Sequence, residues 1–436
     1  MSFKDTSIGV IPIAWDVVEI SQLLHEGSRN GIYKKKEFHG RGVKIVNMGE
    51  LFSYEKISAQ EMKRVDLTKE EKNKFLLKEG DLLFARRSLT AEGAGKSSII
   101  GKLDEETTFE SSIIRLRVNS QKVNSYFLYY YFKSPFGRHS IGSILRQTAV
   151  AGITGSDLVK LEVPIPKIHE QNNIIRILSS LDEKIELNNQ MNKTLEEMAQ
   201  ALFKRWFVDF EFPSEDGEPY KSSGGEMVDS ELGMIPKGWE VKCISEVCYF
   251  NKSSYTNKDS WEYINYLDTA NITTNEINEI QRIDCSVDKI PSRAKRKVEK
   301  DSLVYSTVRP NQLHYGMIKK PVENMLVSTG FVVLDSKSTF LKNDLIYYWL
   351  IQEDNTEKLQ AIAETTTSTY PSIKATDIKN MKIVLPTKEL LLELSSKFGQ
   401  INSYINSLQE ESSTLKGIRE TLLPKLMSGE LRVTDL

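Results

Sequence analysis

The sequence contains few of the residues on which metal and disulfide sites are built. Among its 436 residues there are only three cysteines, Cys243, Cys248 and Cys285. Their irregular spacing fits neither a zinc site nor a disulfide framework, so we expect all three to stay reduced. The histidines are equally scattered, and surface or hydrogen-bonded roles suit them better than catalysis. They are His25, His39, His139, His169 and His314.

Long apolar runs are also absent. No stretch approaches the roughly 18 consecutive apolar residues that span a membrane. The opening segment MSFKDTSIGVIPIAWD lacks the apolar core and cleavage site of a signal peptide. With 39% hydrophobic and 27% charged residues, the chain has the composition of a soluble globular protein. We therefore expect a cytoplasmic protein without membrane contact, and its length predicts two or three domains.

Catalytic motifs are missing as well. The sequence has no HExxH or GxSxG motif and no paired Cys–His ligand spacing. It also lacks the glycine-rich S-adenosylmethionine loop and the Asn/Asp-Pro-Pro-aromatic element that an adenine methyltransferase needs. We expect a chain that is not an enzyme and that binds no cofactor or metal directly.

One stretch, RRSLTAEGAGKSS at 86–98, nearly matches the phosphate-binding loop G-x-x-x-x-G-K-[ST]. Gly95 and Lys96 fit that pattern, but Thr90 stands where the first glycine should be. The residues that follow, 97–110, read as strand and turn and not as the helix that a phosphate cradle requires. The sequence therefore argues against nucleotide hydrolysis.

Charge is distributed unevenly along the chain. The net charge is −2, but the segment 209–231 alone carries −7, which leaves +5 for the rest. Two basic clusters stand out, and either could be ordinary solvated surface or an electrostatic footprint on nucleic-acid phosphate. The first contains Lys34, Lys35, Lys36, Arg41 and Lys44, and the second contains Arg293, Lys295, Arg296 and Lys297.

The sequence repeats itself. Five segments of the first half return in order in the second half, at shifts between 217 and 224 residues. The pairs are 8–17 with 232–241, 43–48 with 264–269, 80–84 with 301–305, 128–132 with 345–349, and 153–166 with 373–386. Such order at nearly constant shift indicates a tandem duplication. Lys96 falls on Met317 in this alignment, so the second copy could not share a phosphate cradle.

Each copy ends in a long helical pattern that follows Pro166 or Pro386. Apolar residues recur with 4-3 spacing over four heptads, which predicts a coiled-coil seam, although each helix could instead pack on its own domain. The first seam is Ile174, Leu178, Leu181, Ile185, Asn188, Asn192, Leu195, Ala199 and Leu202. The second is Leu394, Phe398, Ile401, Ile405, Leu408, Ser412, Leu415, Arg419 and Leu422. Because their polar positions differ, we expect the two helices to pair with each other.

Polar loops follow matching strands in both copies. Arg, Asn and Gln side chains suit bidentate contacts with base edges, although exposed loops of this kind can also simply face water. The candidates in the first copy are Arg86, Arg87, Ser88, Thr90, Lys96, Arg146, Gln147 and Thr148. Those in the second are Thr307, Arg309, Asn311, Gln312, His314, Thr367, Ser368 and Tyr370. Two scaffolds with divergent loops predict recognition of two different half-sites.

Over its whole length the sequence resembles the specificity subunit of type I DNA restriction–modification enzymes. The resemblance is carried by the Ile-Pro-x-x-Trp openings, by the Gly-Asp-Leu-Leu-Phe segment and by the Asp-Leu-x-x-Leu-x-Val-x-Ile-Pro strand. The helix ends at 195–210 and 421–431 carry it too. It implies an α+β fold with two target-recognition domains held by an antiparallel coiled coil. The expected divisions are recognition domains at 1–165 and 232–385, helical spacers at 166–210 and 386–436, and an acidic linker at 211–231.

The resemblance also implies partners. It implies binding to double-stranded DNA, to two methyltransferase subunits and to restriction subunits, with S-adenosylmethionine, ATP and magnesium on those partners. We expect a methyltransferase to dock on the outer helix faces around Phe203, Trp206 and Phe207, although these aromatics could instead cap the coiled-coil core. Two alternatives stay open: a protein-binding scaffold, and the recognition subunit of a methylation-only or fused-nuclease system.

Overall fold

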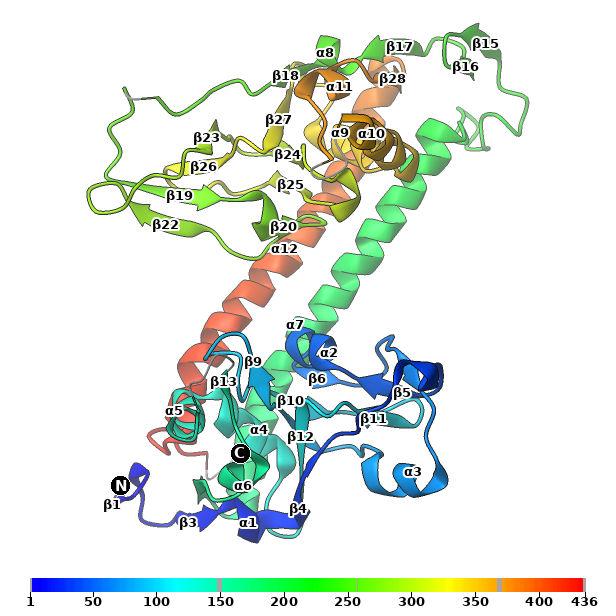
Figure 1. Cartoon of the computed structure of the whole chain (residues 1–436). Helices are drawn as coiled ribbons and strands as arrows, with labels where there is room; N and C mark the ends of the chain where they lie inside the picture. Colours follow the sequence, from blue (N-terminus) through cyan, green and yellow to red (C-terminus); the bar gives the residue numbers. More distant parts are fainter. Residues whose placement is uncertain (1, 147–150, 257, 367–370, 434–436) are drawn as a thin grey trace. The chain divides into compact units, whose positions relative to one another are not determined.

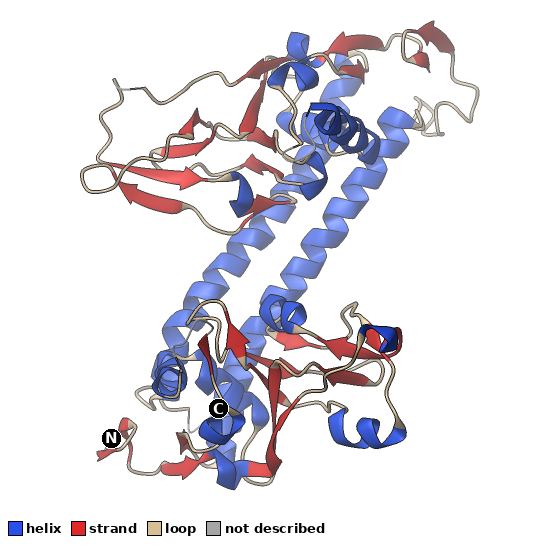
Figure 2. Cartoon of the chain, viewed as in Figure 1, coloured by secondary structure: helices blue, strands red, loops and turns tan. Residues whose placement is uncertain are grey.

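The computed structural model describes residues 2–146, 151–256, 258–366 and 371–433. Its residues form two compact units: unit 1, Met1–Glu186 with Ser412–Leu436, and unit 2, Leu187–Glu411. Each unit mixes sheets with helices, as Figure 2 shows by colour. The two long helices, α7 (Ile168–Phe203) and α12 (Lys388–Met427), each contribute residues to both units. The finer boundaries expected from the sequence remain a prediction.

Unit 1 is built around a five-stranded sheet in the order β4-β12-β8-β10-β6, with a three-stranded sheet β11-β5-β7. Its strands are β1 (Phe3–Thr6), β2 (Gly9–Pro12), β3 (Asp16–Glu19), β4 (Leu24–Asn30), β5 (His39–Val46), β6 (Lys56–Ile57), β7 (Arg64–Val65), β8 (Leu82–Ala85), β9 (Arg87–Ser88), β10 (Ser97–Ile100), β11 (Thr107–Phe109), β12 (Ile113–Val118), β13 (Ala151–Gly152) and β14 (Glu162–Ile165). Its shorter helices are α1 (Ile20–Leu23), α2 (Met48–Ser53), α3 (Lys69–Phe75), α4 (Ser125–Lys133), α5 (Pro135–Ser143) and α6 (Gly155–Leu158), with the 3-10 turn η1 (Lys36–Phe38).

Unit 2 has two four-stranded sheets, β18-β27-β24-β25 and β22-β19-β26-β23. Its strands are β15 (Met227–Ser230), β16 (Gly233–Pro236), β17 (Glu240–Cys243), β18 (Cys248–Phe250), β19 (Tyr263–Leu267), β20 (Ile272–Thr273), β21 (Glu276–Ile277), β22 (Gln281–Asp284), β23 (Ala294–Lys297), β24 (Ser302–Ser306), β25 (Tyr315–Ile318), β26 (Met325–Ser328), β27 (Phe331–Ser336) and β28 (Lys382–Leu385). Its shorter helices are α8 (Ile244–Val247), α9 (Asn343–Leu350), α10 (Glu353–Thr366) and α11 (Ala375–Lys379), with the π-helix η2 (Lys204–Val208) and the 3-10 turns η3 (Thr269–Asn271) and η4 (Pro310–Gln312).

The duplicated segments occupy equivalent places in the two units. Strand β14 pairs antiparallel with β3 in unit 1, and β28 pairs antiparallel with β17 in unit 2. Helices α4 and α9 are buried over most of their length, since the runs 127–132 and 344–350 are buried on every side. A helix that is apolar all round belongs in a core, and these two anchor the main clusters of their units.

The long helices lie antiparallel within each unit (Figure 1). In unit 1, Asp182 of α7 forms an ion pair with Arg419 of α12 at 2.7 Å. In unit 2, Asn188 Nδ2 donates to Glu411 Oε2 at 2.8 Å, and farther along α7 the Phe203 ring contacts Phe398. Along these contacts the residue numbers on α7 increase while those of their partners on α12 decrease. The two helices therefore run antiparallel. The expected fold class, two tandem mixed α/β domains with long helices that pair antiparallel, is confirmed.

The seam residues named from the sequence all lie at buried or half-buried positions. They are Leu178, Leu181, Ile185, Leu195, Leu202, Phe398, Ile401, Ile405, Leu408, Leu415 and Leu422. The polar seam positions are also covered: Asn188 and Ser412 are buried and Asn192 is half-buried. Each of these three keeps a buried oxygen without a hydrogen-bond partner within the described residues. Such groups weaken the seam and favour one alignment of it.

Candidate nucleic-acid interface

The phosphate-loop-like stretch of unit 1 folds as a tight polar turn between β9 and β10. Thr90 N donates to Ser88 Oγ at 3.2 Å, and Gly93 N donates to Thr90 Oγ1 at 3.2 Å. Gly95 has φ of +73°, where a Cβ would also meet Ile141 at 2.4 Å. Lys96 turns inward, since its Nζ donates to the Phe52 carbonyl at 2.8 Å and lies 5.1 Å from the Phe52 ring. We therefore remove Lys96 from the expected DNA contacts.

Two polar loops of unit 1 that lie far apart in the sequence are joined by backbone hydrogen bonds. Strand β9 pairs with β13, so that Arg87 lies opposite Gly152 and Ser88 opposite Ala151. The Ile153 N–H donates to the carbonyl of Arg86 at 3.0 Å. These bonds join segments more than sixty residues apart in sequence into a single ribbon.

Unit 2 repeats that junction with other side chains. Val308 bridges to Ser372, and the Ile373 N–H donates to the Thr307 carbonyl at 2.8 Å. When the two copies are aligned by the duplication, Val308 corresponds to Arg87 and Thr307 to Arg86. The two contacts are therefore equivalent to those in unit 1. The backbone frame is therefore the same in both units while the loop side chains differ.

The unit 2 loop holds an unusual backbone shape at its tip. Arg309 and Leu313 have positive φ angles of 47° and 57°, which non-glycine residues seldom adopt. They flank the turn η4, whose Asn311 N–H donates to Gln360 Oε1 at 3.2 Å. Arg309, Asn311 and Gln312 are all exposed. Strained loops held by their surroundings are common at binding sites, because the strain fixes side chains before a ligand arrives.

Other expected loop residues have structural partners. His314 Nδ1 donates to the Ile272 carbonyl at 2.7 Å, and Thr307 Oγ1 donates to the Gly330 carbonyl at 2.8 Å. Arg86 is half-buried, whereas Arg87 and Arg146 are exposed, and Arg146 pairs with Asp157 at 2.7 Å. Five more candidates lie outside the described residues: Gln147, Thr148, Thr367, Ser368 and Tyr370.

The first basic cluster is only partly available to a ligand. Lys44 is buried against Asp104 and Glu105, and its hydrogen bond to Asp104 raises its pKa. Lys34 pairs with Glu71 at 2.6 Å. Two exposed lysines, Lys35 and Lys36, remain at η1. The third exposed cation of the cluster, Arg41, forms an ion pair with Asp66 at 3.3 Å. Lys44 is therefore a core ion-pair residue and not part of a footprint.

The second basic cluster lies on and beside β23. Arg293 and Lys295 are exposed. Arg296 is half-buried, and burial lowers the pKa of its guanidinium. Lys297 pairs with Asp259 at 2.5 Å. Of the four cations, the first two can therefore reach a phosphate without breaking an ion pair.

The aromatic residues expected to dock a methyltransferase are core residues. Phe203, Trp206 and Phe207 are all buried, and each ring contacts Phe398 of α12 at 6.1 to 6.2 Å between centroids. Phe207 also packs against Trp239 at 5.7 Å. A partner cannot reach these side chains while unit 2 stays folded. We correct their assignment: they fasten the end of α7 to unit 2.

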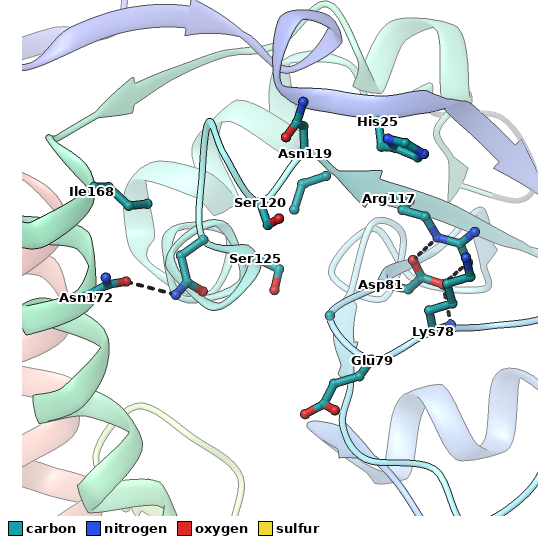
Figure 3. A pocket seen from close by; sticks show the side chains of 13 residues that line it. His25, Lys78, Glu79, Asp81, Arg117, Asn119, Ser120, Ser125, Ile168 and Asn172 are labelled. Atoms are coloured by element: carbon teal, nitrogen blue, oxygen red, sulfur yellow. Dashed lines mark hydrogen bonds and ion pairs between the residues drawn. The ribbon is translucent and has the colours of Figure 1, made fainter.

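A polar cleft of about 520 Å³ opens in unit 1 beside β12 and α4. Its buried carboxylate, Asp81, faces Arg117 at 2.7 Å, as Figure 3 shows. Asn124 and Asn172 also line the cleft, and Asn124 Nδ2 donates to Asn172 Oδ1 at 3.0 Å. The charges of Asp81 and Arg117 thus neutralise each other, and no nucleophile–base pair occurs among the lining residues. Nor does any group of three or more His, Cys, Asp or Glu in the described part of the chain form a metal site.

Comparison with known proteins decides the family. The model of the type I restriction modification DNA specificity domain matches residues 12–197 and again 236–402. The chain belongs to that family. Its two specificity domains coincide with the two copies of the internal repeat, and the assigned role of the family is DNA specificity and not catalysis.

Individual members of the specificity family align over most or all of the chain. The Methanocaldococcus jannaschii type I restriction enzyme MjaIX specificity subunit is 28% identical over 100% of this chain and 97% of its own length. The Haemophilus influenzae HindI specificity subunit is 26% identical over 64% of this chain and 71% of its own. The crystal structure of a type I restriction-modification S subunit from M. genitalium shares the fold, with a TM-score of 0.51 at 16% identity, over 95% of this chain and 96% of that one. In the described residues, no helix is long and apolar enough to cross a membrane.

Proposed function

We propose that the chain reads an asymmetric, bipartite DNA site, with one half-site for each unit. The observation that carries this proposal is the loop junction. In both units two polar loops are joined by equivalent backbone bonds, at Arg87 and Gly152 in unit 1 and at Val308 and Ser372 in unit 2. A common frame with different side chains suits two readers of different sequences.

Exposed side chains at the junctions provide the chemistry of base recognition. Arg309 and Arg87 offer guanidinium forks for guanine, and Asn311 and Gln312 offer amides for adenine. Exposed Lys35 and Lys36 offer cations to phosphate, which position the protein without reading sequence. Because the two junctions carry different groups, the two half-sites differ.

The chain, in this proposal, directs catalytic partners to the site it reads. Two methyltransferase subunits modify the DNA, and restriction subunits cleave it. S-adenosylmethionine, ATP and magnesium are bound by those partners. Support comes from family membership, from the chain's specificity domains and from the absence of catalytic motifs in its sequence.

The helices act as a ruler between the half-sites. Helix α7 has 36 residues, which corresponds to about 54 Å at about 1.5 Å per residue. Half-sites one turn of DNA apart are about 34 Å between centres. Inserting four residues near Asn188 lengthens the helix by about 6 Å, so we expect a longer preferred spacer with both half-sites unchanged. Residues 1–215 alone should pair through their single helix and read a symmetric site.

The decisive experiment first identifies the site by methylation-sensitive sequencing of a genome that carries the system. Duplexes with one half-site scrambled, or with a changed spacer, are then bound at several salt concentrations. We expect each half-site to contribute separately, with a steep salt slope on all DNA. Equal affinity for the site and for random duplex would contradict the proposal. If the insertion near Asn188 left the preferred spacer unchanged and residues 1–215 stayed monomeric, the proposal that the helices set the spacer would be wrong. The proposal of two half-sites would still stand.

A further inference from the structure

An outward-facing apolar patch with a central carboxylate occurs on the first hairpin of unit 1. In β1–β2, Asp5 lies opposite Val10 and Phe3 opposite Pro12, so these side chains share one face of the ribbon, on which Pro12 is buried and the other three are exposed. Phe3 is 41% exposed and Val10 58% exposed, and Asp5 is exposed between them. The other face carries Ile11, which is buried in the core of unit 1.

The first hairpin of unit 2 presents the same chemistry. In β15–β16, Asp229 lies opposite Met234, and Met227 shares their face. Met234 is 50% exposed, Met227 is half-buried and Asp229 is exposed. Ile235 on the other face is buried in the core of unit 2. We call Phe3, Asp5 and Val10, and likewise Met227, Asp229 and Met234, the hairpin patches.

The turns behind the two patches are built alike. Thr6 Oγ1 donates to the Gly9 carbonyl at 2.6 Å, and Ser230 Oγ donates to the Gly233 carbonyl at 2.6 Å. Both glycines have positive φ, +104° and +95°. The patches therefore have the same backbone shape at a shift of 224 residues, and they keep an apolar–acid–apolar pattern, whereas the loop junctions have exchanged their side chains.

We propose that each hairpin patch docks one copy of the same protein, through an apolar surface that carries a central lysine or arginine. Neither the Asp5 nor the Asp229 carboxylate has a hydrogen-bond or ion-pair partner in the described residues. A basic group of the partner would neutralise each carboxylate while the apolar side chains around it become buried. DNA is a poor occupant, because these carboxylates repel phosphate. One surface presented twice binds two copies of one partner.

The partner is the methyltransferase subunit, an assignment that rests on the proposed function. The full chain is co-expressed with its cognate methyltransferase, and the copies bound are counted by native mass spectrometry. We expect two copies on the unaltered chain, one on Asp5→Lys, one on Asp229→Lys and none on the double variant. Asp5→Glu should keep two copies, because it retains the charge.

The matched control is Val287→Lys, since Val287 is 81% exposed in unit 2 and lies outside both patches. It should keep two copies, and all variants should melt at the temperature of the unaltered chain because the changed side chains face solvent. Two copies on the double variant would overturn the hairpin proposal while leaving the function intact. No copy on the unaltered chain would instead overturn the proposed partner, and the docking proposal with it.

Discussion

The two units fasten the helix pair with different chemistry. In unit 1, Arg419 of α12 makes ion pairs with Asp182 at 2.7 Å and with Glu55 at 3.3 Å. In unit 2, the ring of Phe398 is enclosed by Trp206 and Phe207. One unit thus relies on partly buried charge and the other on aromatic burial, although both descend from one duplicated segment.

Each unit hydrogen-bonds a tyrosine of its buried helix to α7, but the two acceptors are not counterparts, because Asp182 corresponds to Asn402 and not to Glu196 at the shift of 220 residues. Tyr130 donates its hydroxyl to Asp182 at 2.8 Å, and its counterpart Tyr347 donates to Glu196 at 2.7 Å. Both acceptors are carboxylates on α7. Each of these two buried hydroxyls therefore keeps a hydrogen-bond partner, whereas leaving one unpaired would cost about 1–3 kcal/mol.

Removing the aromatic attachment should have the largest effect. Phe398→Ala deletes a fully buried ring and is expected to lower the free energy of unfolding by about 3–5 kcal/mol. Its counterpart in the repeat, Leu178→Ala, should cost about 2–5 kcal/mol and loosen unit 1 instead. Denaturant unfolding gives the totals, and hydrogen exchange assigns each loss to its unit. Loosening of unit 1 by Phe398→Ala would contradict the comparison.

The second-largest effect is expected on DNA recognition, where a substitution in one unit should affect only the half-site that this unit reads. Arg87→Ala should relax one base position of the first half-site, and Arg309→Ala one of the second, each at about 1–3 kcal/mol of binding free energy. Competition binding against single-base variants of the site measures both. If Arg309→Ala weakened all duplexes equally, its role would be phosphate positioning.

Two carboxylates, Glu55 in unit 1 and Glu196 in unit 2, should contribute to stability with opposite pH dependence. Burial alone raises the pKa of Glu55, but the charges of Lys133 and Arg419 outweigh it, so the pKa is lowered. The ionised form then stabilises unit 1 above the ordinary glutamate value of about 4.3, and this is lost as pH falls through the lower folded value. Burial raises the pKa of Glu196 despite the Tyr347 hydrogen bond, so unit 2 loses stability as pH rises through the raised value.

Two isosteric variants check these directions. Glu55→Gln should reduce the acid sensitivity of unit 1, and Glu196→Gln should stop unit 2 from weakening above the ordinary glutamate pKa. Hydrogen exchange between about pH 3 and 8 reports each unit separately. If stability changed with pH in the same way in both variants, the predicted difference between Glu55 and Glu196 would be wrong.

The smallest effect is expected at the phosphate-facing lysines. Lys35→Ala and Lys36→Ala should each lower the salt slope of DNA binding by about 0.9 for a lost phosphate contact, without changing sequence preference. Lys34→Ala is the matched control, because its ammonium is already paired with Glu71. Unchanged slopes for Lys35 and Lys36 would place them outside the interface.

Local and periodic features could be predicted from the sequence because they depend on neighbours along the chain. The duplicated segments and the 4-3 spacing each leave a pattern that can be read along the chain. The candidate interface was predictable only as separate loops. Nothing near Arg87 in the sequence indicates that Gly152 pairs with it, since that contact closes a long stretch of chain. Lys44 was assigned to the surface for the same reason, because its partner Asp104 is remote in sequence.

The sequence by itself determined the repeated architecture and the residue types at the seam, since apolar periodicity fixes which helix face is buried. Only the tertiary structure decided which side chains of a cluster reach solvent. Lys96, Phe203 and Trp206 are chemically suited to binding, but each has a partner inside its own unit. Conversely, Asp5 and Asp229 became candidate binding residues only in the structure, because cross-strand pairing places them among exposed apolar neighbours. Burial and partnership depend on contacts between distant segments, and these exist only in the folded chain.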